Sequence, residues 1–196
     1  ISPSTVSPSM IGTTISDRVS RLHARYRASL FTSSTMIVAF SLAAAPASDK
    51  RVELNVRRVP GGKGTAFIHD TLKVGDPIEL VGPLGHFFVR RSDPQPALFL
   101  AGGSGLSSPK SMILDLLEGG DARTITLVYG ARNRAELYYH DFFVALTQQY
   151  PNFRYVPALN EPTEASAWDG FTGCVHEPPK AHFANAFRCN TAYICG

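Results

Sequence analysis

The chain has 196 residues and a mass of 21.3 kDa; 44% of the residues are hydrophobic, 18% are charged, and the formal net charge is +3. This length is enough for one large domain or two small ones with a buried core, and no apolar run of about 18 residues predicts a membrane-spanning helix. A charge of +3 without clustered Lys and Arg is not typical of a nucleic-acid-binding surface, so we expect neither nucleic acid nor a membrane as a partner.

The cysteines and the turn-forming residues narrow the class further. Three cysteines without CxxC spacing predict free thiols rather than a disulfide framework or a zinc site, and they favour a reducing, cytoplasmic location. Sixteen Gly and 14 Pro are more than a helical bundle accommodates, which favours strands and turns.

All of the net charge lies in residues 1–37. This segment contains four Arg and one Asp, whereas the rest of the chain contains 15 Lys and Arg and 15 Asp and Glu. The segment is rich in Ser and Thr, and it follows neither the period of a strand nor that of a helix. Three interpretations remain open: an organellar transit peptide, a disordered arm, or an out-of-frame or foreign stretch that does not belong to the domain that follows.

The pattern of residues 38–95 is typical of strands and turns with one short helix. The alternation in RVELNVRRV predicts a strand over 51–59 with one apolar face. The Gly-rich loop PGGKGT leads into a short helix, with Thr65 as the candidate N-cap. Turn residues then bound two further short strands, over 78–81 and 85–89.

After a linker, Asp93-Pro94-Gln95-Pro96, strands alternate with helices. Continuous apolar runs predict strands buried on both faces, and apolar residues at helical spacing predict helices. The expected strands are 97–101, 124–130, 153–159 and 191–195, and the expected helices are 110–120 and 136–150. This alternation predicts a parallel α/β sheet with right-handed crossovers. We therefore expect one domain over 38–95 and a second over 96–196.

The strongest local motif is AGGSGLSSP, because it follows a predicted strand and precedes a predicted helix. Backbone N–H groups at a helix N-terminus can hold a pyrophosphate, and glycine allows its close approach. Ser108 replaces the third glycine of the GxGxxG fingerprint, so the match is partial. Pro109 excludes a P-loop, and Leu106 excludes the GxSxG elbow of an α/β hydrolase. A Gly-rich turn with only a structural role stays the alternative.

Three weaker features also have simple alternatives. The loop GGKGT suits a phosphate, but most such loops are only turns. Phe40 beside Ser41 could face a flat ring system, although a buried Phe next to a surface Ser is commoner. Cys195 ends a predicted parallel strand, where open α/β sheets bind ligands, although a lone Cys is more often a small core residue.

The chain resembles the reductase component of multicomponent phenol hydroxylases, within the ferredoxin reductase superfamily. The resemblance covers about residues 39–196 and rests on ten segments in order: AFSLA, VRRV, GGKGT, KVGD, GPLGHFF, AGGSGLSSP, YGARNRAELYY, PALN, WDGFTG and AYICG. It implies a β plus α/β fold, in which a partial Greek-key antiparallel flavin barrel is followed by a Rossmann-like parallel-sheet domain that binds a nicotinamide nucleotide.

The resemblance also implies roles for the residues that match its motifs. The expected flavin contacts are the ring contacts Phe40 and Ser41, the ribityl and phosphate contacts Val56 and Arg57, and the pyrophosphate contacts Gly62, Gly64 and Thr65. The expected nicotinamide-nucleotide contacts are Gly102, Gly103, Gly105, Pro109, Gly130, Ala131 and Arg132. Ser41, near the reactive flavin nitrogen, and Cys195, which approaches the nicotinamide, are the expected catalytic residues.

The chain departs from the family at several places. Val38 stands where the family has an Arg that pairs with the flavin phosphate, so a charge-assisted contact is lost. Residues 1–37 do not match the first barrel strands, and the chain stops at Gly196 without the following prolines, helix and aromatic residue. The C-x4-C-x2-C ligand run of a 2Fe-2S domain is also missing, so we expect no metal here. These departures predict a partial chain, truncated at its C-terminus.

The implied reaction is hydride transfer from NADH to FAD, after which single electrons pass through an iron–sulfur centre to the oxygenase component of an aromatic hydroxylase. NADH is favoured over NADPH by the family alone, whereas Arg132 and Arg134 could accept a 2′-phosphate. The alternative is an inactive fragment or a bare nucleotide-binding module, which the lost Arg and the unmatched strands support.

Overall fold

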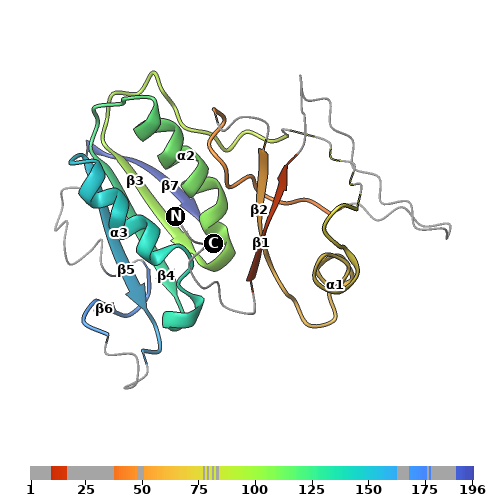
Figure 1. The fold of residues 1–196 in the computed structure, drawn as a ribbon. Coiled ribbons are helices and arrows are strands. Elements are labelled where there is room, and N and C mark those ends of the chain that lie inside the picture. Colours follow the sequence, from red (N-terminus) through yellow and green to blue (C-terminus); the bar gives the residue numbers. More distant parts are fainter. Residues whose placement is uncertain are drawn as a thin grey trace.

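The computed structural model describes residues 10–16, 38–47, 51–76, 78, 80, 82, 84–162, 168–175, 177 and 189–196. Within these ranges the chain forms a small two-stranded domain and a larger α/β domain that lie side by side (Figure 1). The transit-peptide, disorder and frame interpretations concern residues 1–37. Apart from residues 10–16, this segment lies outside the described residues.

The second domain is built on a parallel sheet of five strands, β3 (Ala97–Gly102), β4 (Ile125–Ala131), β5 (Phe153–Leu159), β6 (Phe171–Thr172) and β7 (Thr191–Cys195). Their order is β6-β5-β4-β3-β7. The helices α2 (Ser107–Glu118) and α3 (His140–Gln149) connect β3 to β4 and β4 to β5, and both lie on one face of the sheet (Figure 1). The predicted Rossmann-like domain is confirmed.

The core of this domain follows from the apolar runs that predict its strands. Every residue of β4 is buried, as expected for a central parallel strand covered on both faces. Phe99 is fully buried and stacks on Tyr193, with 4.9 Å between ring centroids. Ile113 and Leu116, on the apolar stripe of α2, are fully buried against the sheet. Burial of this continuous core is the main source of the domain's stability.

The first domain contains the antiparallel pair β1 (Met10–Ser16) and β2 (Arg51–Arg57), with Met10 opposite Arg57 and Ser16 opposite Arg51. Residues 38–47 run along the other edge of β2, where Leu42 forms a bridge with Leu54. The sequence pattern of residues 1–37 predicts no strand, so β1 is a difference from the expectation. Pairing with β2 accounts for it, because the antiparallel backbone ladder can hold a segment extended even where its local alternation is weak.

The Gly-rich loop of this domain leads into α1 (Lys63–Ala66) and a π-helical turn (Phe67–Thr71). Gly62, not Thr65, is the N-cap of α1. The hydroxyl of Thr65 accepts from the backbone N–H of Val59 at 3.2 Å and donates to the carbonyl of Gly62 at 3.1 Å. Thr65 therefore closes the loop onto β2, and the prediction that it caps the helix is wrong.

Two predicted strands of the first domain are also wrong. Residues 85–89 form no strand, and neither do residues 78 and 80, the described members of the predicted strand 78–81. Gly85 has φ of +93°, a left-handed conformation that interrupts an extended strand. The apolar residues Phe87 and Phe88 remain about half exposed, so the apolar run of this segment does not form a buried face.

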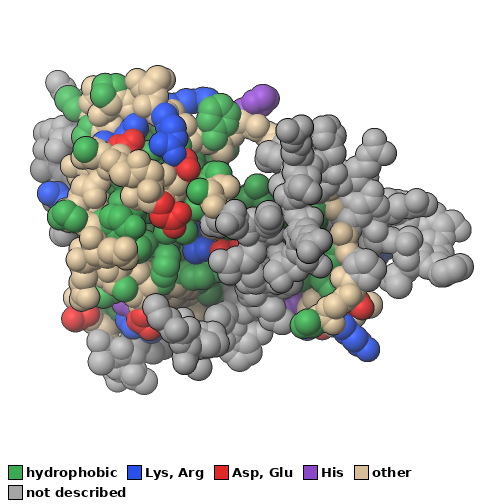
Figure 2. Space-filling model, turned by 45° about the horizontal axis from the view of Figure 1, so that its top comes forward, with side chains coloured by type: hydrophobic (Ala, Val, Ile, Leu, Met, Phe, Trp, Pro, Cys, Tyr) green, Lys and Arg blue, Asp and Glu red, His purple; other side chains and the backbone are tan. Residues whose placement is uncertain are grey.

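Two surface properties bear on function. No helix among the described residues is long and apolar enough to cross a membrane. On the face shown in Figure 2, basic and acidic side chains of the described residues are interspersed rather than gathered into a patch of one sign.

Candidate functional site

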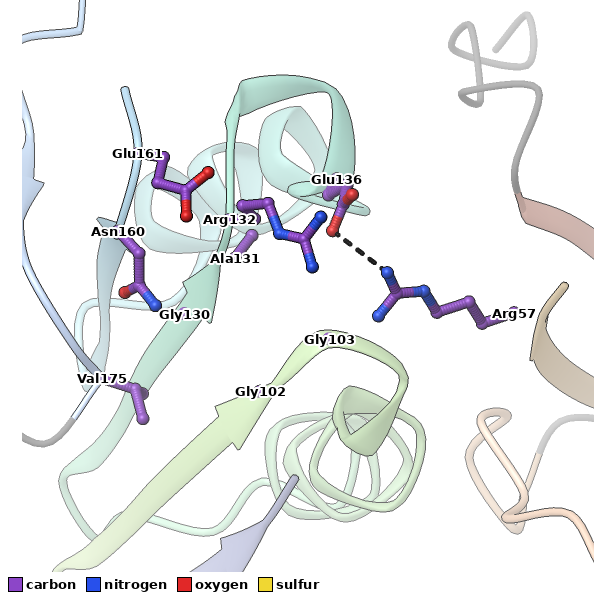
Figure 3. Close-up of a pocket in the computed structure, with 10 residues that line it drawn as sticks. All are labelled: Arg57, Gly102, Gly103, Gly130, Ala131, Arg132, Glu136, Asn160, Glu161 and Val175. Atoms are coloured by element: carbon purple, nitrogen blue, oxygen red, sulfur yellow. Dashed lines mark ion pairs between the residues drawn. The ribbon is translucent and has the colours of Figure 1, made fainter. Parts of the chain in front are cut away.

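The carboxyl ends of β3, β4 and β5 border a pocket of about 420 Å³ that reaches β2 of the first domain (Figure 3). Ligands of open α/β sheets bind at this end of the strands. The pocket is lined by Arg57, Gly102, Gly103, Gly130, Ala131, Arg132, Glu136, Asn160, Glu161 and Val175.

The floor of the pocket is a glycine turn at the end of β3. Gly102 ends the strand, and a 3-10 turn over Gly103–Leu106 leads into α2. Gly103 has φ of +51°, and a Cβ added there would meet no atom within 4 Å, so backbone faces open space. The hydroxyl of Tyr129 donates to the carbonyl of Gly103 at 3.2 Å, and burial raises the pKa of Tyr129, which keeps this donor protonated.

The wall of the pocket carries charges of both signs. Arg57 extends from β2 toward Glu136 of the second domain, and their ion pair measures 3.7 Å (Figure 3). Arg132 directly follows β4, and its guanidinium points to the same side of the pocket. Glu161 lies on the opposite side, after β5. Two guanidinium groups near a side-chain-free glycine turn can hold a phosphate or pyrophosphate.

Two of the predicted glycines have a packing role. A Cβ on Gly105 would lie 2.7 Å from the carbonyl carbon and oxygen of Cys195, at the end of β7. A Cβ on Gly130 would lie 2.8 Å from Cβ of Val175. At Gly105 two backbone segments approach each other closely, and at Gly130 a backbone segment approaches a side chain. Both positions therefore need glycine.

The structure brings most of the predicted nicotinamide-nucleotide contacts together. Five of the seven line the pocket, namely Gly102, Gly103, Gly130, Ala131 and Arg132, and so does Arg57, which is a predicted flavin contact. Cys195 is paired with Ala101 in the sheet and adjoins Gly105, so it stands beside the glycine turn without lining the pocket. Pro109 is fully buried in the first turn of α2, where its missing N–H is no loss.

The predicted flavin contacts other than Arg57 lie elsewhere in the first domain. Ser41 is exposed and Phe40 is partly buried, on the segment that follows the edge of β2. The side chain of Val56 is buried inside the domain. Gly62, Gly64 and Thr65 belong to the loop around α1 and do not line the pocket, and a Cβ on Gly64 would meet a methyl group of Val38 at 2.7 Å.

Four lining residues were not predicted: Glu136, Asn160, Glu161 and Val175. A signal exists for Asn160 and Glu161, because polar residues directly after a buried parallel strand lie at the ligand-binding edge. Glu136 ends a short 3-10 helix (Arg134–Glu136) and Val175 lies in a turn, and no local pattern indicates that either returns to the sheet. No cluster of His, Cys, Asp or Glu that could hold a metal ion occurs among the residues described by the structure.

Two family models match the chain. A model described as the oxidoreductase NAD-binding domain matches residues 99–196, and one described as the oxidoreductase FAD-binding domain matches residues 20–89. The chain belongs to the FAD- and NAD-binding oxidoreductases. The match to the FAD-binding domain begins at residue 20 and therefore includes residues 20–37. The local pattern of residues 1–37 gives no sign of this.

Two relatives are named as proteins of phenol hydroxylases. The reductase component DmpP of phenol 2-monooxygenase from Pseudomonas sp. (strain CF600) is 58% identical over 158 residues, and the phenol hydroxylase P5 protein from Acinetobacter pittii (strain PHEA-2) is 54% identical over 158 residues. Each alignment covers 81% of this chain and 45% of the relative. The resemblance to these reductases is confirmed, and the chain spans about half of their length.

Solved structures of two reductases support the fold. The Amycolatopsis cytochrome P450 reductase GcoB is 25% identical with a TM-score of 0.75, and the match covers 97% of this chain and 58% of GcoB. A ferredoxin NADP+ reductase from Neisseria gonorrhoeae, with bound FAD and NADP, has a TM-score of 0.75 at 20% identity and covers 95% of this chain and 79% of its own. The predicted flavin-barrel and Rossmann-like fold class is confirmed.

Proposed function

We propose that this chain is the catalytic part of a flavin-dependent reductase that passes electrons from NADH through FAD toward the oxygenase component of an aromatic hydroxylase such as phenol hydroxylase. The observation that carries the proposal is the pocket between the two domains, which is lined both by Arg57 of the first domain and by the glycine turn of the second. The 58% identity to a phenol 2-monooxygenase reductase component supports the same substrate class.

The pocket fits part of a dinucleotide. Its volume of about 420 Å³ lies within the range of small-ligand sites. The open space at Gly103 allows the pyrophosphate to approach the backbone, while Arg132 and Arg57 offset its charge. Bound NADH supplies a hydride and bound FAD accepts it, so this chain's residues contribute position and electrostatics.

The flavin has a less complete set of contacts in the described part of the first domain. Ser41, exposed on the edge of β2, offers a hydroxyl, and Phe40 offers a ring face. Val38 packs at Gly64 and supplies no charge to a phosphate, which leaves Arg57 as the cation on β2 that points to the pocket. In this proposal Ser41 hydrogen-bonds the flavin ring and Cys195 contacts the nicotinamide from the end of β7.

The remaining parts of the electron path belong to the whole protein. A 2Fe-2S domain outside this chain takes the electrons singly and delivers them to the oxygenase, and the reductase acts in the cytoplasm. The relatives' greater length supports a further domain, and the name of DmpP as a reductase component supports an oxygenase partner.

The test is anaerobic reduction of the purified chain after loading with FAD. Addition of NADH is expected to bleach the visible absorbance of the bound flavin, with NADPH less effective. A chain that binds NADH but no FAD, or that holds FAD without bleaching, would contradict the proposal and favour a bare nucleotide-binding module.

A matched pair of variants at Gly103 tests the pocket itself. Gly103→Asp and Gly103→Asn are nearly identical in size, and both side chains tolerate a positive φ. The aspartate places a negative charge where the pyrophosphate is expected, so NADH binding should weaken by roughly tenfold or more relative to the asparagine variant. Equal affinities in the two variants would place the pyrophosphate elsewhere.

A further inference from the structure

Strand β2 presents a polar face to the second domain. Its apolar residues Leu54 and Val56 point into the first domain and are buried. The alternate residues Glu53, Asn55 and Arg57 each reach a side chain of the second domain. A polar strand face is normally exposed to solvent, whereas the side chains of this face contact three residues of the second domain.

Lys110 is the central partner. Its side chain is only 5% exposed, and its ammonium lies 2.8 and 2.9 Å from the two carboxylate oxygens of Glu53. The ammonium also donates to the carbonyl of Ala43 at 3.1 Å, in the segment along β2. Next to it, the hydroxyl of Ser111 donates to the carbonyl of Ala44 at 2.6 Å. All three ammonium hydrogens of Lys110 are therefore directed to the first domain.

Tyr139 is the second partner. Its phenol oxygen lies 2.7 Å from Oε1 of Glu53 and 2.8 Å from Oδ1 of Asn55, and the ring lies 4.6 Å from the ammonium of Lys110. Tyr139 has φ of +56° and is the only non-glycine residue with positive φ in the described ranges. An aromatic residue keeps this conformation only when its surroundings enforce it. Burial, together with the Glu53 carboxylate, raises the pKa of Tyr139, so the phenol remains a donor.

These contacts connect the two cofactor regions directly. Lys110 lies in the first turns of α2, directly after the glycine turn that lines the pocket. Glu53 and Asn55 precede Arg57 on the strand that reaches the same pocket. A buried ammonium must keep its charged partner, since an unpaired one is strongly disfavoured. The network therefore permits few relative orientations of the domains.

We propose that Lys110, Glu53, Asn55 and Tyr139 form a clamp that fixes the glycine turn relative to β2 and thereby sets the approach of the nicotinamide to the flavin. These four are positioning residues, because they act through the backbone of α2 and β2 and not on the reacting atoms. The clamp itself is a property of this chain; only its effect on hydride transfer rests on the proposed function.

The first test measures domain orientation without any cofactor. Nitroxide labels are attached to Val59→Cys in the first domain and Glu118→Cys at the end of α2, both exposed positions, in a chain whose three native cysteines are replaced by Ser. Pulsed electron resonance should give one narrow distance distribution, and Lys110→Met should broaden it. The control Asp70→Asn removes an exposed ion pair with Arg58 inside the first domain and should leave the distribution narrow.

A milder variant keeps the test informative if Lys110→Met does not fold. Tyr139→Phe removes only the hydroxyl, and it should also broaden the distribution while the far-ultraviolet circular dichroism stays unchanged. A narrow distribution in both Tyr139→Phe and folded Lys110→Met would overturn the proposal. Lys110→Arg, which keeps the charge, should restore part of the narrow distribution.

The second test measures the reaction. In the FAD-loaded chain, Tyr139→Phe should lower the rate of flavin bleaching at saturating NADH by roughly tenfold, with a much smaller change in KM, because misplacement affects the reaction more than binding. A rate equal to that of the unaltered chain contradicts the catalytic consequence. If NADH never bleaches the flavin of the unaltered chain, the proposed function is wrong. The distance measurement then still tests whether the four residues form the clamp.

Discussion

The two domains are stabilised in different ways. The second domain has a continuous buried core that runs from Ala97 to Tyr193 across four strands and two helices, and Val89, which precedes the linker, packs against it. The first domain, in its described part, buries only a few small or medium apolar side chains, such as Leu54 and Val56. Its central strand instead directs three polar side chains to its neighbour. The first domain thus depends on the second for part of its order, whereas the second has its own core.

The largest expected effect concerns the core of the second domain. Phe99→Ala removes a fully buried ring that stacks on Tyr193, and it should lower the free energy of unfolding by about 3–5 kcal/mol. Trp168, the only tryptophan and part of this domain's packing, reports the loss in urea unfolding. A loss below about 1 kcal/mol would show that the sheet does not depend on this core.

The corresponding change in the first domain should be smaller and local. Val56→Ala removes two methyl groups from a buried site, and we expect about 2 kcal/mol of destabilisation. Hydrogen exchange of the β2 amides should accelerate, while the unfolding followed by Trp168 fluorescence should change little. If hydrogen exchange of β2 and Trp168 fluorescence reported equal losses of stability, the two domains would unfold as one unit. The difference between them drawn above would then be wrong.

Two glycines of the same turn should respond differently to a methyl group. Gly105→Ala places Cβ 2.7 Å from the backbone of Cys195, so β7 must shift, at a cost of about 1–3 kcal/mol. Gly103→Ala meets no atom within 4 Å and carries only the cost of positive φ, about 1 kcal/mol. Urea unfolding compares the two variants, and a larger loss for Gly103→Ala would refute the packing role of Gly105.

The smallest effect is a pH dependence in the second domain. Burial, with the nearby charge of Arg134, lowers the pKa of His140 below 6.5, against the opposing effects of Asp141 and Asp169. The folded chain therefore binds fewer protons than the unfolded chain as pH falls through 6.5, and stability from this group is lost on acidification. His140→Gln should lose less stability between about pH 7.5 and about pH 5.5 in urea unfolding. An unchanged pH slope would exclude His140 as its source.

The parts of the structure that could be predicted from the sequence are those with local signals. The apolar runs of β3, β4, β5 and β7 predict their bounds within one residue, because a strand buried on both faces needs no partner pattern to be recognised. The glycine turn follows from its place after such a strand, whereas Arg132 is implied by the family resemblance. In the first domain the alternation of β2 predicts its buried face correctly.

The parts that could not be predicted depend on long-range contacts. Strand β1 is defined by its pairing with β2, and Glu136, in a 3-10 helix, and Val175, in a turn, reach the pocket only through the folding of the connections around them. Glu53 and Asn55 occupy the face of β2 that sequence periodicity assigns to water, and nothing local indicates that Lys110 covers it. Residues 85–89 differ in the other direction, because their apolar sequence predicts a strand that the backbone does not form. Gly85 has a positive φ there, and Phe87 is exposed.

The most direct test of the central claim is single-turnover reduction of the FAD-loaded chain by NADH and by NADH deuterated at the transferred C4 position. If the pocket between the domains brings nicotinamide and flavin together for hydride transfer, the flavin absorbance bleaches with both, and more slowly with the deuterated form. Absence of flavin bleaching would contradict the account. A bleaching rate that stays the same whatever fraction of the chain is loaded with FAD would also contradict it.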